Sequence, residues 1–166
     1  MTLCSRRSIQ HLRRLGLVLG FPVLSIGGAS QPQAPVAVAQ DAAVASANQE
    51  KARMWMTVGE RRFAITLANT DAARAFTAWF PLTLDMAEIN GNEKYADLPK
   101  TLPTDASRPG TIHNGDLMLY GSSTVVVFYE SFRSPYSYTC LGRVDDPVEL
   151  AQVLGRRSVR VVFSKD

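Results

Sequence analysis

The chain has 166 residues, 46% of them hydrophobic and 20% charged, so it suits one folded domain with an appendage and is not a disordered chain. Its formal net charge is +3, but four of the 18 basic residues precede residue 40, which leaves 14 basic against 15 acidic residues in the remainder. Because that remainder is nearly neutral and has no basic stripe, we expect no nucleic-acid partner.

The first 29 residues have the organisation of an export signal. A basic, polar start precedes the apolar run Leu15–Ile26, which at about a dozen residues is too short to span a bilayer. The opening Ser5–Gln10 resembles a bacterial twin-arginine signal, and the alternatives are a general secretory signal or an uncleaved amphipathic tail. We predict a signal peptide over residues 1–29 with cleavage between residues 29 and 40, an exported (periplasmic or secreted) protein, and no transmembrane anchor.

The next segment, residues 30–50, is rich in Ala, Pro, Gln and Ser and contains no aromatic side chain. It cannot bury enough apolar surface to fold alone, so we predict a flexible linker. A single domain is then expected over residues 51–166.

The first half of this domain alternates between extended segments and turns. The pattern predicts, in order, strands at residues 54–58 and 62–67, a helix at 72–79, a strand at 82–86 and a turn at 90–92. Gly59 separates the first two strands and supplies the positive φ that a hairpin turn needs. Thr70 and its neighbours offer a helix N-cap, and Pro81 ends the helical pattern.

The second half contains the most β-branched residues. It predicts loops at residues 104–114 and 132–137, strands at 116–120, 124–129, 138–144 and 158–163, and a helix at 147–154 that begins at the capping pair Asp145 and Asp146. The continuous apolar run Val125–Phe128 is typical of a strand covered on both faces. Seven or eight short strands with only two helices favour a closed barrel, because closure removes exposed strand edges.

Several segments within residues 53–164 carry a family resemblance: Phe80–Leu84, Asn90–Tyr95, Gly115–Gly121, Phe128–Phe132, Tyr136–Thr139 and Leu141–Pro147. On these residues the chain resembles the bacterial cyclophilin-like domain family. The resemblance implies a mainly β fold, a closed eight-stranded barrel with two helices, whose lumen is filled by side chains and whose ligands dock in an outer groove. True cyclophilins, the peptidyl-prolyl isomerases, have a Phe-His-Arg signature that this sequence lacks, because its His113 is followed by Asn114. The resemblance therefore assigns no catalytic residue to this chain.

Prolyl isomerisation needs an apolar pocket for the proline ring and a donor that favours the twisted amide. Arg143 and Arg133 are the candidate donors. The candidate ligand-binding residues are the aromatic side chains Tyr120, Tyr129, Phe132, Tyr136 and Tyr138. The alternative is that the aromatics are half-buried strand residues, which strands favour anyway, and that the arginines are solvated.

The acidic residues and the single histidine of the domain are the other candidates for catalysis or metal binding. Among Glu88, Glu93 and Glu130, Glu130 is the best candidate acid or base because it follows a buried run, and the alternative is pairing with an arginine or a backbone amide. His113 is the only histidine of the domain, and the two cysteines form no CxxC pair, so we expect no metal and no cofactor.

These observations lead to one hypothesis and one alternative. The hypothesis is an exported cyclophilin-like domain that binds a peptide or small ligand in an outer aromatic groove. If the domain is an enzyme, the expected activity is weak peptidyl-prolyl cis-trans isomerisation. The alternative is a non-catalytic interaction or structural module of the cell envelope. A proline-peptide isomerisation assay separates an enzyme from a binding module.

Overall fold

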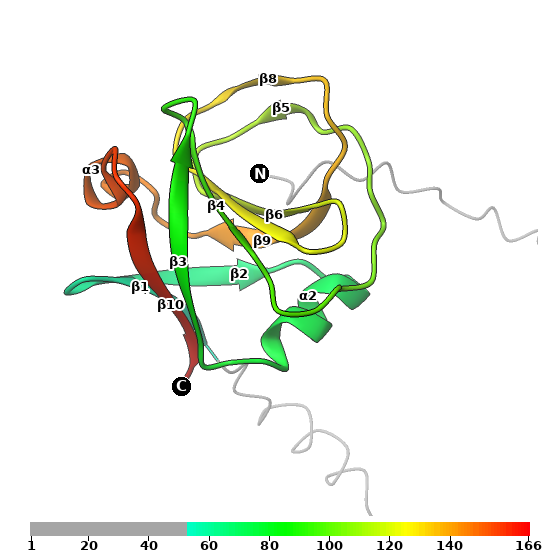
Figure 1. Cartoon of the computed structure of the whole chain (residues 1–166), viewed down its shortest axis with the longest axis horizontal. Helices are drawn as coiled ribbons and strands as arrows, with labels where there is room; N and C mark the ends of the chain where they lie inside the picture. Colours follow the sequence, from blue (N-terminus) through cyan, green and yellow to red (C-terminus); the bar gives the residue numbers. More distant parts are fainter. Residues whose placement is uncertain (1–52) are drawn as a thin grey trace, which may run out of the picture. The chain divides into compact units, whose positions relative to one another are not determined.

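The structure is a computed structural model that describes residues 53–166 (Figure 1), so the predicted signal peptide and linker lie outside the described residues. In chain order the elements are β1 (Met54–Val58), β2 (Arg61–Leu67), α2 (Asp71–Thr77), β3 (Leu82–Ile89), β4 (Glu93–Asp97), β5 (Gly110–Ile112), β6 (Asp116–Tyr120), β7 (Thr124–Phe128), β8 (Phe132–Ser134), β9 (Thr139–Val144), α3 (Leu150–Leu154) and β10 (Val159–Lys165).

Eight of these strands close into a barrel. Their order around the wall is β1-β10-β3-β4-β7-β6-β9-β2, with β2 pairing again with β1, and every neighbouring pair is antiparallel. The mainly β, closed eight-stranded barrel with two helices that the sequence predicts is therefore confirmed. The hairpin between β1 and β2 turns at Gly59, which has the expected positive φ of 57°.

The lumen of the barrel is filled by the protein's own side chains. Alternate residues of each strand point inward and form one apolar cluster, which includes Met56, Phe63, Met86, Leu119 and Val127, each no more than 7% exposed. Residues alternate in this way because successive side chains of a β-strand point to opposite faces of the sheet. Because the lumen is packed, only the outer wall of the barrel and its rims are free to bind a ligand.

The two helices lie at opposite ends of β3 (Figure 1). Helix α2 leads into the start of β3, whereas α3 leads into the start of β10, and β10 runs antiparallel to β3 with Phe163 opposite Leu82. Phe76 of α2 contacts Phe163 with ring centroids 5.2 Å apart, and Leu150 and Leu154 of α3 join the same lumen cluster. Each helix therefore adds apolar side chains to one end of the lumen. Neither helix is long and apolar enough to span a membrane within the described part of the chain.

The first helix begins as expected, whereas the second does not. Thr70 Oγ1 accepts a hydrogen bond from Ala73 N at 3.1 Å, which is the predicted N-cap of α2. The prediction that α3 begins after Asp145 and Asp146 is wrong, because Asp145 accepts a hydrogen bond from Thr66 Oγ1 at 2.5 Å and Asp146 closes a local turn. The helix begins only at Leu150.

A second, smaller sheet covers part of the outer wall. Strands β5 and β8 pair with each other in the two segments that the sequence predicts as loops, residues 104–114 and 132–137. The loop prediction is wrong there because three-residue strands are too short to show a period. Ile112 and Phe132 of this sheet pack against Met118, Val126 and Phe128 on the outer face of β6 and β7. The run Val125–Phe128 is therefore buried on both faces, as the sequence predicts.

Candidate functional site

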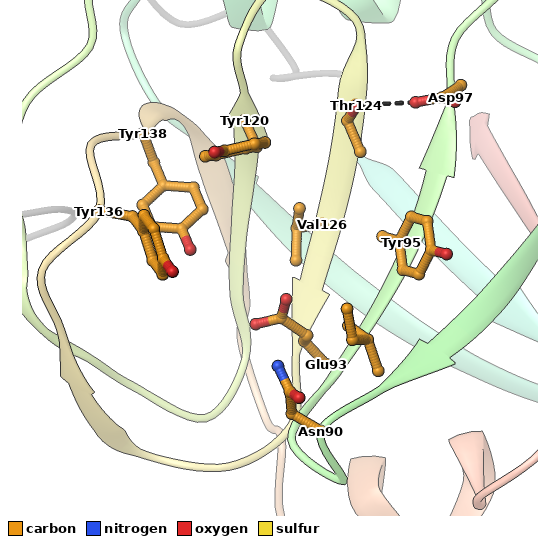
Figure 2. Close-up of a pocket in the computed structure, with 10 residues that line it drawn as sticks. Asn90, Glu93, Tyr95, Asp97, Tyr120, Thr124, Val126, Tyr136 and Tyr138 are labelled. Carbon is orange, nitrogen blue, oxygen red and sulfur yellow. Dashed lines mark hydrogen bonds between the residues drawn. The ribbon is translucent and has the colours of Figure 1, made fainter.

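An open cavity of about 410 Å³ lies on the outer face of the barrel wall, beside the chain that follows β8 (Figure 2). Four of the ten side chains that line it are tyrosines, and we call it the tyrosine pocket. Its lining comes from the end of β3 (Ile89), the β3–β4 turn (Asn90), β4 (Glu93, Tyr95, Asp97), β7 (Thr124, Val126) and three further tyrosines (Tyr120, Tyr136, Tyr138).

Strand periodicity decides which residues face the pocket. On β4, Lys94 and Ala96 point into the lumen and are buried, so Glu93, Tyr95 and Asp97 point outward. On β7, the neighbouring strand, Val126 takes the outward position opposite Tyr95. The pocket thus has a floor of regular sheet, on which side-chain positions are fixed by the ladder of backbone hydrogen bonds.

The tyrosines form walls on two sides of Val126 (Figure 2). On one side the ring centroids of Tyr120 and Tyr136 are 6.2 Å apart at an interplanar angle of 85°, and those of Tyr120 and Tyr138 are 5.6 Å apart. Tyr95 stands on the other side. Tyr138 is buried, whereas Tyr120 and Tyr136 keep 48% and 58% of their surface exposed. The pocket therefore offers aromatic rings to solvent on a surface that is otherwise rigid sheet.

Both ionisable carboxylates of the pocket come from β4, but only one of them has a hydrogen-bond partner. Asp97 Oδ1 accepts a hydrogen bond from Thr124 Oγ1 at 2.7 Å. The Glu93 carboxylate points toward the side of the pocket that Tyr136 and Tyr138 line (Figure 2), and no hydrogen bond or ion pair from residues 53–166 engages it. Burial, followed by the nearby Glu88 carboxylate, raises the pKa of Glu93 above its ordinary value.

On the other face of the same wall, Glu88, Lys94 and Tyr129 form a closed polar group that we call the Glu88 cluster. Lys94, which is 0% exposed, donates from Nζ to Glu88 Oε2 at 2.5 Å and to the Arg157 carbonyl at 2.7 Å. The Tyr129 hydroxyl lies 2.7 Å from both Glu88 carboxylate oxygens, and Gly91 N donates to Oε1 at 2.8 Å. The two charges and the Tyr129 hydroxyl thus have partners within the protein, as a structural polar group does.

The electrostatics of the Glu88 cluster follow from those bonds. Burial on its own disfavours the charged form of Glu88, but the hydrogen bonds from Lys94, Tyr129 and Gly91 outweigh burial, and the pKa of Glu88 falls below its ordinary value. Burial and the hydrogen bond to Glu88 raise the pKa of the Tyr129 hydroxyl. Glu88 is therefore ionised and Tyr129 protonated at neutral pH, and each stabilises the other's state.

Of the five aromatic residues predicted from sequence to bind a ligand, the structure brings three together. Tyr120, Tyr136 and Tyr138 line the tyrosine pocket. Tyr129 is 4% exposed and belongs to the Glu88 cluster and the lumen core. Phe132, on β8, packs against Phe128 with ring centroids 5.8 Å apart.

The three preferred candidates for catalysis, Arg143, Arg133 and Glu130, do not line the tyrosine pocket, whereas Glu93, ranked below Glu130, does. Arg143 is half-buried on β9 and donates to the Asn114 carbonyl at 3.2 Å. Arg133 is exposed on β8, and Glu130 is exposed beyond the end of β7. Cys140 is partly buried on β9.

Sequence reasoning missed Tyr95 as a pocket residue and ranked Glu93 below Glu130, although both Tyr95 and Glu93 line the tyrosine pocket. Both follow the turn at Asn90, and the signal that would have found them is the period of two in Glu93–Asp97, which places alternate residues on one face of a strand. The apolar run before Glu130 predicts a carboxylate with apolar neighbours, but that run ends inside the barrel wall and leaves Glu130 in solvent.

Comparison with known proteins places the chain by family. The model of the cyclophilin-like family matches residues 56–164, which is nearly the whole of the described domain and more than half of the chain. No curated protein matches this sequence. Within residues 53–166, no group of three or more His, Cys, Asp or Glu side chains is placed to hold a metal ion.

Proposed function

We propose that this chain, which belongs to the cyclophilin-like family, is an exported binding module that takes a peptide or small ligand into the tyrosine pocket. The observation that carries the proposal is a cavity of about 410 Å³ with four tyrosine rings around it. Ligand pockets typically measure about 300–1,000 Å³ and combine apolar or aromatic walls with a few polar groups. The tyrosine pocket has this size and this mixture, on the outer wall that the packed lumen leaves available.

The same geometry supports binding rather than prolyl isomerisation. A prolyl isomerase needs a hydrogen-bond donor, such as a guanidinium, beside the pocket that holds the proline ring. The pocket contains no arginine or lysine, and its charged side chains, Glu93 and Asp97, are acceptors when ionised. Its remaining donors, such as the tyrosine hydroxyls and the Asn90 amide, are neutral and polarise an amide less strongly than a guanidinium. We therefore expect isomerisation of X-Pro peptides at the rate seen in buffer.

Export rests on the sequence of residues 1–29, with its basic start and its short apolar run. Expression of the full chain in a bacterial host, followed by cell fractionation and sequencing of the N-terminus, tests it. We expect a new N-terminus between residues 29 and 40 in the periplasmic or secreted fraction. An intact Met1 in the cytoplasmic fraction would contradict export.

The binding proposal is tested by screening peptides and small molecules against the full-length protein and locating any bound ligand by NMR. We expect shifts centred on Tyr95, Tyr120 and Tyr136. The variant Tyr136→Ala removes an exposed ring and should weaken binding about tenfold or more, in the range of an aromatic anchor. Arg133→Ala, an exposed change on β8 outside the pocket, serves as the control and should leave the affinity unchanged. A ligand that binds elsewhere, or equally well without the Tyr136 ring, would contradict the proposal.

A further inference from the structure

The charged side chains that line the tyrosine pocket are all of one sign, which bears on the charge of a ligand that it can bind. Its ionisable carboxylates, Glu93 and Asp97, are both acidic, and no arginine or lysine lines it. Asp97 has a hydrogen bond from Thr124, but Glu93 has no partner among the described residues. A partly buried carboxylate without a partner is unfavourable, since burial removes water without replacing its hydrogen bonds.

Within residues 53–166, the basic side chains near Glu93 on the chain do not neutralise its carboxylate. Lys94, the next residue along β4, points to the opposite face of the wall, where Glu88 and the Arg157 carbonyl hold its ammonium. Arg156 approaches the β3–β4 turn, where its guanidinium lies 3.0 Å from the position that a Cβ on Gly91 would take, but it makes no ion pair with Glu93. Residues 53–166 therefore supply no partner for Glu93, and a ligand that enters the pocket can supply one.

The aromatic walls favour the same kind of partner. The face of a tyrosine ring is electrostatically negative and attracts an ammonium or guanidinium group within about 6 Å, by about 0.5–2 kcal/mol depending on desolvation. Three tyrosines stand on the side of the pocket toward which the Glu93 carboxylate points (Figure 2). A cation placed there is attracted by the aromatic rings and by the carboxylate together, whereas an anion would be repelled by the ionised carboxylate.

We propose that the occupant of the tyrosine pocket is a basic side chain, arginine or lysine, presented by a peptide. This rests on the proposed function and names its ligand class. A peptide fits better than a free small cation because Tyr120 and Tyr136 remain about half exposed, at 48% and 58%. A ligand whose charge reaches Glu93 therefore continues past these two rings to the surface and covers them.

The test compares matched peptides against the full-length protein by isothermal titration and NMR. The probes are Ac-Gly-Gly-X-Gly-Gly-amide, in which X is arginine, its neutral isostere citrulline, lysine, or the neutral norleucine, together with choline as a free cation. We expect the arginine or lysine peptide to bind about tenfold or more tightly than its neutral counterpart, the range of one charge-assisted contact. Choline should bind more weakly than the charged peptides.

Two variants assign the preference to one carboxylate. Glu93→Gln keeps the size of the side chain and should reduce the preference for the charged peptide to about twofold or less, whereas Glu60→Gln, on the exposed β1–β2 turn, should leave it unchanged. Equal binding of arginine and citrulline peptides, a preference that survives Glu93→Gln, or choline binding as tightly as the arginine peptide would each overturn the inference. If no probe binds, this inference fails, and the proposed function is judged separately by the wider ligand screen and its Tyr136→Ala variant.

Discussion

Two glutamates on neighbouring strands show how the same side chain serves two purposes in this barrel. Glu88 on β3 lies directly across from Lys94 on β4, and Glu93 lies one step along, across from Ile89. Glu88 faces the interior side of the wall and is held by three donors, so its pKa is lowered. Glu93 faces the outer pocket, where burial raises its pKa and no donor from residues 53–166 offsets that effect.

The difference separates a structural carboxylate from a candidate binding carboxylate. Where the protein supplies every hydrogen-bond partner, as in the Glu88 cluster, a ligand has nothing to contribute. Where the fold leaves an accessible carboxylate in an aromatic pocket unpaired, a ligand can supply the missing charge. Glu88 should therefore govern stability and Glu93 should govern affinity, and the predictions below test that division from the largest expected effect to the smallest.

The largest effect is expected from Glu88→Ala. The change leaves the Lys94 ammonium, which is 0% exposed, without its carboxylate partner. Removing one partner of a buried ion pair costs about 3–5 kcal/mol, because the other charge stays buried and uncompensated. Urea unfolding of the full-length protein measures the loss. A cost below about 1 kcal/mol, close to that of the exposed control Glu60→Ala, would show that the cluster is not a structural element.

The double variant Glu88→Leu with Lys94→Met sharpens this result. Replacing a whole buried ion pair by apolar side chains of similar volume is often neutral or stabilising, by up to about 4 kcal/mol. The double variant should therefore recover most of the stability that Glu88→Ala loses. The Tyr129 hydroxyl also loses its acceptor, which costs about 1–3 kcal/mol if water does not replace it. Urea unfolding again gives the comparison, and a double variant no more stable than Glu88→Ala would contradict the account.

A smaller effect of opposite sign is expected from Glu93→Gln. At neutral pH the partly buried, unpaired charge of Glu93 opposes folding, so its removal should leave stability unchanged or raise it by no more than about 1 kcal/mol. The same variant should lose the preference for basic peptides. Thermal unfolding without ligand measures the first effect. A loss of more than about 1 kcal/mol would mean that Glu93 has a partner in the folded protein.

The pH dependence distinguishes the two glutamates by sign. The stability that Glu88 contributes is present above its unfolded pKa and is lost as the pH falls through its lowered folded pKa. For Glu93 the folded pKa is raised, so the folded state takes up a proton first and stability rises relative to Glu93→Gln as the pH falls through that value. Unfolding curves of the unmodified protein and of Glu93→Gln, recorded between neutral pH and about pH 4, give the difference in their free energies of unfolding. If the variant became increasingly more stable than the unmodified protein as the pH fell, the assignment would be contradicted.

The sequence predicts the barrel because barrel strands carry their own signals. The alternation of Phe63, Ile65 and Leu67, the positive φ at Gly59 and the cap at Thr70 all depend on neighbours in the chain, and the family resemblance supplies closure. The short strands β5 and β8 escape this reasoning because three residues carry no period, and their pairing joins segments far apart in sequence.

The candidate site is only partly predictable for a related reason. Tyr120, Tyr136 and Tyr138 stand out as aromatics beside turn residues, but Tyr129 has the same local pattern and lies inside the wall. Whether a residue faces the lumen or the pocket depends on where each strand begins and on its register with its neighbour. Sequence composition does not show which of Glu88, Glu93 and Glu130 faces the pocket. The register of β3 with β4 places Glu88 and Glu93 one step apart and therefore on opposite faces of the wall.

The most direct test of the division between the two glutamates is an NMR titration of the side-chain carboxyl carbons in the full-length protein, with and without the arginine peptide. We predict that Glu93 titrates above the ordinary glutamate range and Glu88 below it, and that the peptide lowers the pKa of Glu93 while leaving Glu88 unmoved. A Glu93 that titrates at or below its ordinary value without peptide, or whose pKa does not respond when the arginine peptide is bound, would contradict the account.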